Sequence, residues 1–131
     1  MAASEAAARL GPRFAAVGAG RMGRGIAIAF AYAGHPIALV DSRRRDAAAT
    51  TRLRDEAFAE IRQSLESLAQ LGAMDAGAID AIAGRVQWVD GADAPAPLAD
   101  ADMVYEGVPE TLATETFLTN RGGVGFEIAF P

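Results

Sequence analysis

The sequence has no cysteine and only one histidine among its 131 residues. Without cysteine there can be no disulfide framework, no thiolate metal site and no thiol nucleophile. The longest apolar stretch, Ile26–Val40, is interrupted by Gly34-His35-Pro36 and is too short to span a bilayer. Basic residues are fewer than acidic ones, and the resulting net charge of −5 disfavours general attraction to nucleic acid or to anionic membranes.

The remaining composition is that of one folded domain. Hydrophobic residues make up 51% of the chain and charged residues 22%, close to the values for soluble globular proteins. The first ten residues carry Glu5 and no leading basic cluster, so we expect no secretion signal and a cytoplasmic location. We divide the chain into a flexible tail over 1–12, a folded domain over 13–118, and a divergent tail over 119–131 with one candidate strand.

Apolar runs alternate with helical patterns along the predicted domain. The short runs Phe14–Val17 and Ile37–Val40 are typical of strands that are buried on both faces of a parallel sheet. The apolar stretch Met22–Ala33 between them indicates a helix, closed by Gly34 and Pro36. A strand, a turn, a helix and a second strand within about 30 residues form a βαβ unit.

The next predicted strand, Val86–Val89, follows only after a long helical segment. Apolar residues recur at intervals of three or four over Leu53–Leu68, which predicts an amphipathic helix. Asp75 can cap a second helix, which has an apolar stripe over 79–83. We therefore expect a helical hairpin inserted after the second strand.

The last part of the domain is less regular. Composition predicts a loop over Asp90–Pro97, a fourth strand around Met103–Tyr105 and a helix opened by Pro109. The whole pattern predicts an α/β fold of the Rossmann type. We expect a doubly wound, mainly parallel sheet that carries the inserted hairpin and is incomplete.

A glycine-rich turn joins the first strand to the first helix. Its residues fit the pattern G-x-G-x-x-G and are Gly18, Ala19, Gly20, Arg21, Met22 and Gly23. The first glycine permits a sharp turn, the second leaves room for a pyrophosphate, and the third lets the helix approach the strand. The N–H groups at the start of the helix favour a phosphate. We interpret the turn as part of a dinucleotide site; alternatively, the glycines serve only turn geometry and packing.

Asp41 ends the second predicted strand, near the offset of about 20 positions from the first glycine that is expected of an acid binding the adenosine ribose. A carboxylate there accepts hydrogen bonds from the ribose hydroxyls and repels a 2′-phosphate, which favours NAD over NADP. Arg43, Arg44 and Arg45 leave the opposite preference open, because a guanidinium just past the strand could hold that phosphate. The alternative is that they form a solvated basic start to the next helix.

Three blocks of sequence extend this interpretation. They are V-G-A-G-R-M-G-R-G-I-A over Val17–Ala27, A-G-H-P-I-A-L-V-D over Ala33–Asp41 and V-Y-E-G-V-P-E over Val104–Glu110. In order and spacing they resemble the NAD-binding domain of the 3-hydroxyacyl-CoA dehydrogenases over residues 13–118. The long helical pair is also a trait of that family. The resemblance implies hydride transfer between NAD and a 3-hydroxyacyl-CoA, in fatty acid metabolism.

The resemblance also implies roles for individual residues. The three glycines of the turn would contact the pyrophosphate, Asp41 the adenosine ribose, and Glu110 the cofactor near its nicotinamide half. Ser64 matches a serine that contacts CoA in the family. Simpler explanations stay open for two of them, because Glu110 also suits an ordinary helix N-terminus and Ser64 an exposed helix face.

The sequence departs from the family pattern in several places. Glu115 and Leu71 stand where the family has basic residues, which removes positive charge facing anionic ligands. The family's catalytic histidine and glutamate and its helical C-terminal domain have no counterpart here, and we expect His35 in a surface turn. Oxidation of a 3-hydroxyl needs a general base. We therefore expect a fragment or truncated relative that binds NAD but is inactive alone.

Two other interpretations of the sequence remain. One is a domain of another β-hydroxyacid dehydrogenase, against which the inserted hairpin argues. The other is a non-catalytic dinucleotide-binding or interaction module that recruits a partner through an open sheet edge. We expect NAD as ligand, an acyl-CoA substrate only when the missing domain is supplied, and no nucleic-acid, membrane or metal partner. The family dimerises mainly through its C-terminal domain, so we do not expect this chain to form that homodimer.

Overall fold

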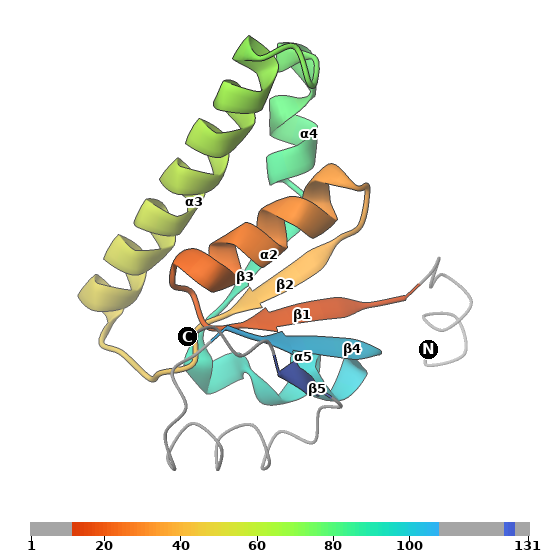
Figure 1. The fold of residues 1–131 in the computed structure, drawn as a ribbon. Coiled ribbons are helices and arrows are strands. Elements are labelled where there is room, and N and C mark those ends of the chain that lie inside the picture. Colours follow the sequence, from red (N-terminus) through yellow and green to blue (C-terminus); the bar gives the residue numbers. More distant parts are fainter. Residues whose placement is uncertain (1–11, 108–124, 128–131) are drawn as a thin grey trace, which may run out of the picture.

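Five parallel strands form a single sheet in the structure, a computed structural model that describes residues 12–107 and 125–127. Their order is β3-β2-β1-β4-β5, and every neighbouring pair runs parallel (Figure 1). The strands are β1 (Phe14–Val17), β2 (Ile37–Val40), β3 (Val86–Val89), β4 (Met103–Glu106) and β5 (Gly125–Glu127). The order is that of the doubly wound Rossmann arrangement. The strands predicted from the apolar runs are confirmed, and β5 is the candidate strand near the end of the chain.

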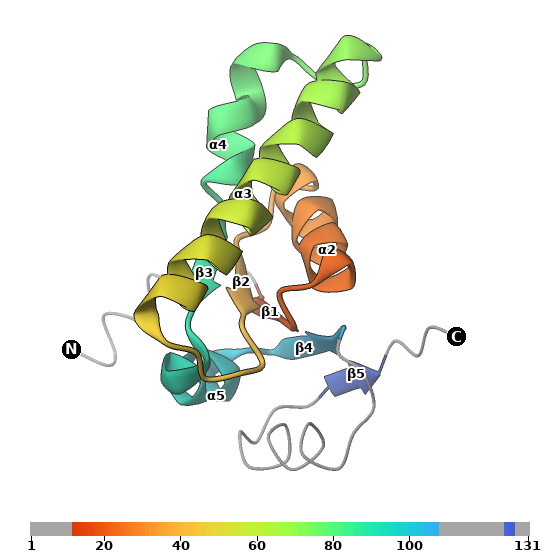
Figure 2. The ribbon, with the colours of Figure 1, turned by 90° about the vertical axis from the view of Figure 1, so that its left-hand side faces the viewer.

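Helices cover both faces of this sheet. Figure 1 shows α2, α3 and α4 over one face and α5 over the other. The helical elements are α2 (Arg21–Tyr32), α3 (Ala47–Gln70), η1 (Ala76–Ala78), α4 (Ile79–Ala83), η2 (Gly91–Asp93) and α5 (Pro95–Asp100). Figure 2 shows α3 and α4 running side by side away from the sheet, which confirms the inserted helical hairpin.

The strands are apolar on both sides because each face packs against helices. Ala16 and Leu39 belong to the larger core, under α2, α3 and α4. Their neighbours Val17 and Val40 belong to the smaller core, which α5 covers through Leu98. Successive strand residues point to opposite faces, so a continuous apolar run supplies both cores. The alanines of β1 and α2 allow the helix to approach the sheet closely.

The long helix α3 follows from its own sequence pattern. The Asp46 side chain caps its start by accepting a hydrogen bond from the Ala49 N–H at 2.7 Å. Ala57, Ile61 and Leu65 recur every four residues and are fully buried against the larger core. The opposite side of the helix is polar and exposed, as expected of an amphipathic helix.

The loop predicted over Asp90–Pro97 is wrong, because the chain forms η2 and α5 there. Pro95 and Pro97 suggested a loop, but both lie in the first turn of α5, where a missing backbone N–H costs no helical hydrogen bond. Leu98 anchors the helix, with only 1% of its surface exposed. The helix predicted to open at Pro109 lies outside the described residues. Within the described part, no helix has both the length and the apolar character needed to cross a membrane.

Candidate functional site

The carboxyl ends of three neighbouring strands meet at one edge of the sheet. Val17, the last residue of β1, lies opposite Val40 of β2 and Glu106 of β4. The chain leaves β1 directly into the glycine turn and leaves β2 directly into Asp41. Ligands of open α/β sheets bind beyond the carboxyl ends of the strands, where the strand order reverses. Here that point lies between β1 and β4.

Two glycines of the turn are required by the fold itself. Gly18 has φ 104°, a conformation that favours glycine, and its N–H donates to the Val40 carbonyl at 2.8 Å. A Cβ on Gly23 would lie 1.6 Å from the Gly18 carbonyl oxygen, where no atom can fit. These two positions therefore need glycine whether or not a ligand binds.

Gly20 is different, because none of the described residues requires glycine there. Its φ of −80° and ψ of −172° suit any residue, and a Cβ would meet no heavy atom within 4 Å. The residue is exposed and forms the N-cap of α2. Turn geometry and packing explain Gly18 and Gly23 but not Gly20. The open space in front of Gly20 fits a group that approaches the backbone from outside.

The start of α2 is arranged to receive an anion. No side chain of the described residues caps the helix, and its first turn has no acidic residue. The first N–H groups of a helix lack intrahelical acceptors, and the helix dipole is positive at this end. Arg21 in the same turn is exposed and adds positive charge. A phosphate placed against this end would receive backbone hydrogen bonds and favourable charge.

Gly107 closes the same site from β4, and the sequence patterns above do not single it out. Its N–H donates to the Val17 carbonyl at 2.9 Å, which continues the β1–β4 pairing beyond the strand. A Cβ on Gly107 would lie 3.0 Å from Met22 Cγ and 3.1 Å from the Gly23 nitrogen. The backbone after β4 therefore packs directly on the first turn of α2. In the sequence, Gly107 stands immediately after an apolar strand and within the block V-Y-E-G-V-P-E, but neither signal showed its contact with α2.

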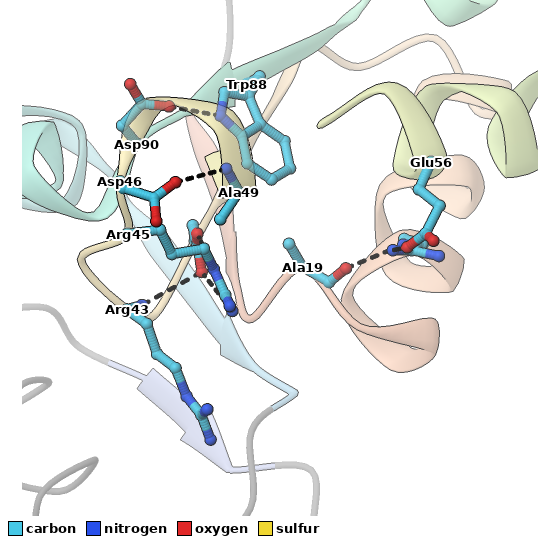
Figure 3. A network of polar contacts seen from close by, with 10 residues as sticks. Ala19, Arg43, Arg45, Asp46, Ala49, Glu56, Trp88 and Asp90 are labelled. Carbon is cyan, nitrogen blue, oxygen red and sulfur yellow. Dashed lines mark hydrogen bonds and ion pairs between the residues drawn. The ribbon is translucent and has the colours of Figure 1, made fainter. Parts of the chain in front are cut away.

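The Arg24 side chain joins the glycine turn to α3. Its Nε donates to the Ala19 carbonyl at 2.8 Å, and its Nη1 pairs with Glu60 Oε2 of α3 at 2.6 Å. A longer contact of 3.4 Å reaches Glu56, visible in Figure 3. The Arg24 side chain is only 12% exposed. The inserted hairpin is thus tied to the turn by a charged contact that joins distant parts of the sequence.

Asp41 is buried at the end of β2, with 1% of its surface exposed. Its Oδ1 accepts from the Arg43 N–H at 3.1 Å, and its Oδ2 pairs with Arg45 Nε at 2.7 Å (Figure 3). Since Gly18 bonds to Val40, the residue just before Asp41, the structure brings the carboxylate and the glycine turn to the same edge. Arg43 and Arg44 are solvated before α3, as one interpretation expected, but Arg45 pairs with the carboxylate.

The other predicted residues lie elsewhere. Ser64 is half-buried in the middle of α3, and Leu71, 82% exposed, follows the end of that helix. His35 is exposed in the turn that enters β2, at the amino ends of the strands, and its ring lies 5.4 Å from that of Phe14. Glu110 and Glu115 lie outside the described residues. Within the described part, no group of three or more metal-ligating side chains occurs.

The fold and this strand-to-helix turn together define a Rossmann-type dinucleotide-binding domain. A family model described as 3-hydroxyacyl-CoA dehydrogenase, NAD binding domain, matches residues 13–120. The chain belongs to this family and is an NAD-binding domain. Among curated proteins no match is found.

Solved structures of the same class are similar to the chain. The 3-hydroxybutyryl-CoA dehydrogenase from Escherichia coli K12 is 34% identical with a TM-score of 0.63, over 83% of this chain and 21% of that protein. FadB2 of M. tuberculosis is 29% identical with a TM-score of 0.62, over 76% of this chain and 32% of FadB2. The fold is also shared by the (S)-3-hydroxybutyryl-CoA dehydrogenase PaaH1 from Ralstonia eutropha, which is 24% identical. Its TM-score is 0.68, over 88% of this chain and 38% of PaaH1. The chain therefore spans well under half the length of these proteins.

Proposed function

We propose that the glycine turn, the first turn of α2 and Asp41 bind the adenosine diphosphate half of NAD. The pyrophosphate would lie against the N–H groups at the start of α2, in the open space in front of Gly20. The ribose hydroxyls would donate to the Asp41 carboxylate at the end of β2. The observation that carries the proposal is Gly20, a glycine that the fold does not need and that a close phosphate would require.

The chemistry of the whole enzyme is a proposal that rests on the family. When bound, NAD would supply the acceptor for a hydride from the carbon that bears the 3-hydroxyl, and a general base would take the hydroxyl proton. Glu110 would contact the nicotinamide half, and Ser64 would contact the CoA of an acyl-CoA substrate. A cytoplasmic location stays a prediction.

The chain's single histidine cannot act as that base. His35 lies where β2 begins, whereas Asp41 and the glycine turn lie where the strands end. Among the described residues, the family's catalytic histidine therefore has no counterpart at the proposed site. We therefore propose that these 131 residues bind NAD but do not oxidise a 3-hydroxyacyl-CoA on their own, and that they do not form the family's homodimer.

The test of the proposed site is the substitution Gly20→Asp. Aspartate is a good N-cap, so the variant should keep its stability, while its carboxylate would occupy and repel the phosphate position. We expect NAD affinity, measured by titration calorimetry, to fall by about a hundredfold, since charge repulsion and lost space act together. Retained affinity would show that NAD does not use this turn.

The matched control is Gly25→Asp, which introduces the same charge further along α2. Gly25 is exposed, and a Cβ there would also meet nothing within 4 Å. Aspartate and glycine are both weak helix formers, so stability should change little. We expect this variant to bind NAD within roughly threefold of the original chain, because the helix dipole acts only near its terminus.

A further inference from the structure

Arg45 lies on the solvent side of the carboxylate that ends β2. The Asp41 side chain is 2% exposed and that of Arg45 is 31% exposed. The guanidinium contacts both carboxylate oxygens, with Nε 2.7 Å from Oδ2 and Nη2 3.4 Å from Oδ1. Arg45 therefore covers Asp41 and compensates its negative charge.

This pairing changes what the site can discriminate. A lone carboxylate at the end of the second strand accepts ribose hydroxyls and repels a phosphate on the 2′-oxygen. A carboxylate that is covered and paired exerts much less repulsion. A guanidinium carries five N–H donors. In Arg45, the Nε and Nη2 groups contact Asp41. The others can bind a phosphate in the bidentate geometry that arginine favours.

The geometry favours Arg45 over its two neighbours. Arg43 contacts Asp41 only through its backbone N–H, and Figure 3 shows its side chain running away from that of Arg45. Arg44 is exposed and forms no ion pair within the described residues. The loop packs closely on the start of η2, since a Cβ on Gly91 would lie 2.3 Å from the Arg43 carbonyl oxygen.

Nearby carboxylates are already engaged with other donors. Asp46 accepts the hydrogen bond from the Ala49 N–H that caps α3. Asp90 accepts from the Trp88 indole N–H at 2.7 Å. Within the described residues, neither carboxylate forms an ion pair with Arg45, whose guanidinium contacts Asp41.

We propose that Arg45 is a specificity-determining residue, and that through it the chain binds NADP with an affinity close to that for NAD. With NADP the guanidinium turns to the 2′-phosphate, and with NAD it leaves the ribose hydroxyls access to Asp41. This inference rests on the proposed dinucleotide site. It replaces the preference for NAD that Asp41 alone predicts by nearly equal affinity for the two dinucleotides.

The experiment is equilibrium binding of NAD and NADP to the original chain, Arg45→Ala and Arg44→Ala. AMP and adenosine 2′,5′-bisphosphate serve as probes that report on the adenosine end alone. For the original chain we expect the two dinucleotide dissociation constants to agree within about tenfold. Arg45→Ala should weaken NADP and the bisphosphate by about tenfold or more while NAD binding stays equal or tightens. Arg44→Ala should leave the ratio of the NADP and NAD dissociation constants unchanged.

The outcomes separate the two proposals. If neither dinucleotide binds the original chain, the proposed site and this inference are both wrong. If NAD binds and NADP binds more than about tenfold more weakly, the inference alone is wrong. The same holds if Arg44→Ala shifts the ratio and Arg45→Ala does not. Should Arg45→Ala fail to fold, Arg45→Lys keeps the charge but loses the bidentate fork, and it should weaken NADP selectively.

Discussion

At the scale of single residues, the glycine turn shows why one motif contains two kinds of position. Gly18 and Gly23 meet conditions set by the protein itself, namely a positive φ and a carbonyl oxygen where a Cβ would be. Gly20 meets neither condition and is open to solvent. Substitutions at these positions should therefore separate stability from binding.

Gly23→Ala should destabilise the fold strongly. The added Cβ would lie 1.6 Å from the backbone oxygen of Gly18, so α2 would have to move away from β1. We expect the free energy of unfolding, measured by urea denaturation, to fall by about 3 kcal/mol or more. Gly25→Ala, in open space on the same helix, should instead raise it by about 0.5–1 kcal/mol. Equal stability of the two variants would contradict the close approach.

At the scale of elements, two ion pairs of the hairpin that extends the crossover from β2 to β3 differ in burial. Arg24 of α2 joins Glu60 of α3 beside the glycine turn and is largely buried. Arg62 of α3 joins Asp80 of α4 at 2.7 Å, and both side chains are well exposed. Buried charged hydrogen bonds matter more than exposed ion pairs, which solvent and salt screen.

Arg24→Met should lower the free energy of unfolding more than the loss of the exposed Arg62–Asp80 pair. It keeps most of the side-chain volume but removes the hydrogen bonds to the Ala19 carbonyl and to Glu60. We expect a loss of about 1.5–3 kcal/mol in the free energy of unfolding and a fall of roughly threefold to tenfold in NAD affinity, because the turn is less well held.

The matched control is Arg62→Met, which removes the exposed pair on the same hairpin. We expect it to cost less than about 1 kcal/mol and to leave NAD affinity unchanged. A similar loss of affinity in both variants would mean that the hairpin acts through its general stability and not through the contact between Arg24 and the turn.

At the scale of the whole molecule, the described part has one large core and one small one. The larger core lies under α2, α3 and α4, and the smaller one depends on α5 and on few large side chains. The site lies where the strands end, and the single histidine lies where they begin. The proposed cofactor site is therefore remote from the histidine, and we propose that His35 takes no part in proton abstraction.

The whole chain should therefore respond to NAD without reacting. At a hundredfold excess of NAD over its dissociation constant, the melting temperature should rise by roughly 10 °C. The same sample mixed with 3-hydroxybutyryl-CoA should form no NADH, and His35→Gln should change neither result. NADH formation by this chain would contradict the assignment of the base to another group, and an unchanged melting temperature would contradict the site.

Local patterns in the sequence were enough to predict the strands, the glycine turn, the hairpin and the place of Asp41. The apolar runs and the turn motif depend on neighbours within a few positions, and parallel strands bring their carboxyl ends together by geometry alone. The turn and Asp41 predicted a dinucleotide with a preference for NAD, and the family resemblance agreed with this ligand.

Only the tertiary structure decided α5, the close approach of Gly107 to α2, the anchoring role of Arg24 and the pairing of Arg45 with Asp41. Pro95 and Pro97 suggested a loop, and only the burial of Leu98 in the core shows why a helix forms there. The requirement for glycine at position 107 is visible only because Met22 packs against it in the folded protein. The physical reason is common to most of these features: each is stabilised by a contact between segments that are distant along the chain. Arg45 and Asp41 are close in sequence, but only the folded β2 end buries the carboxylate and leaves the guanidinium to cover it.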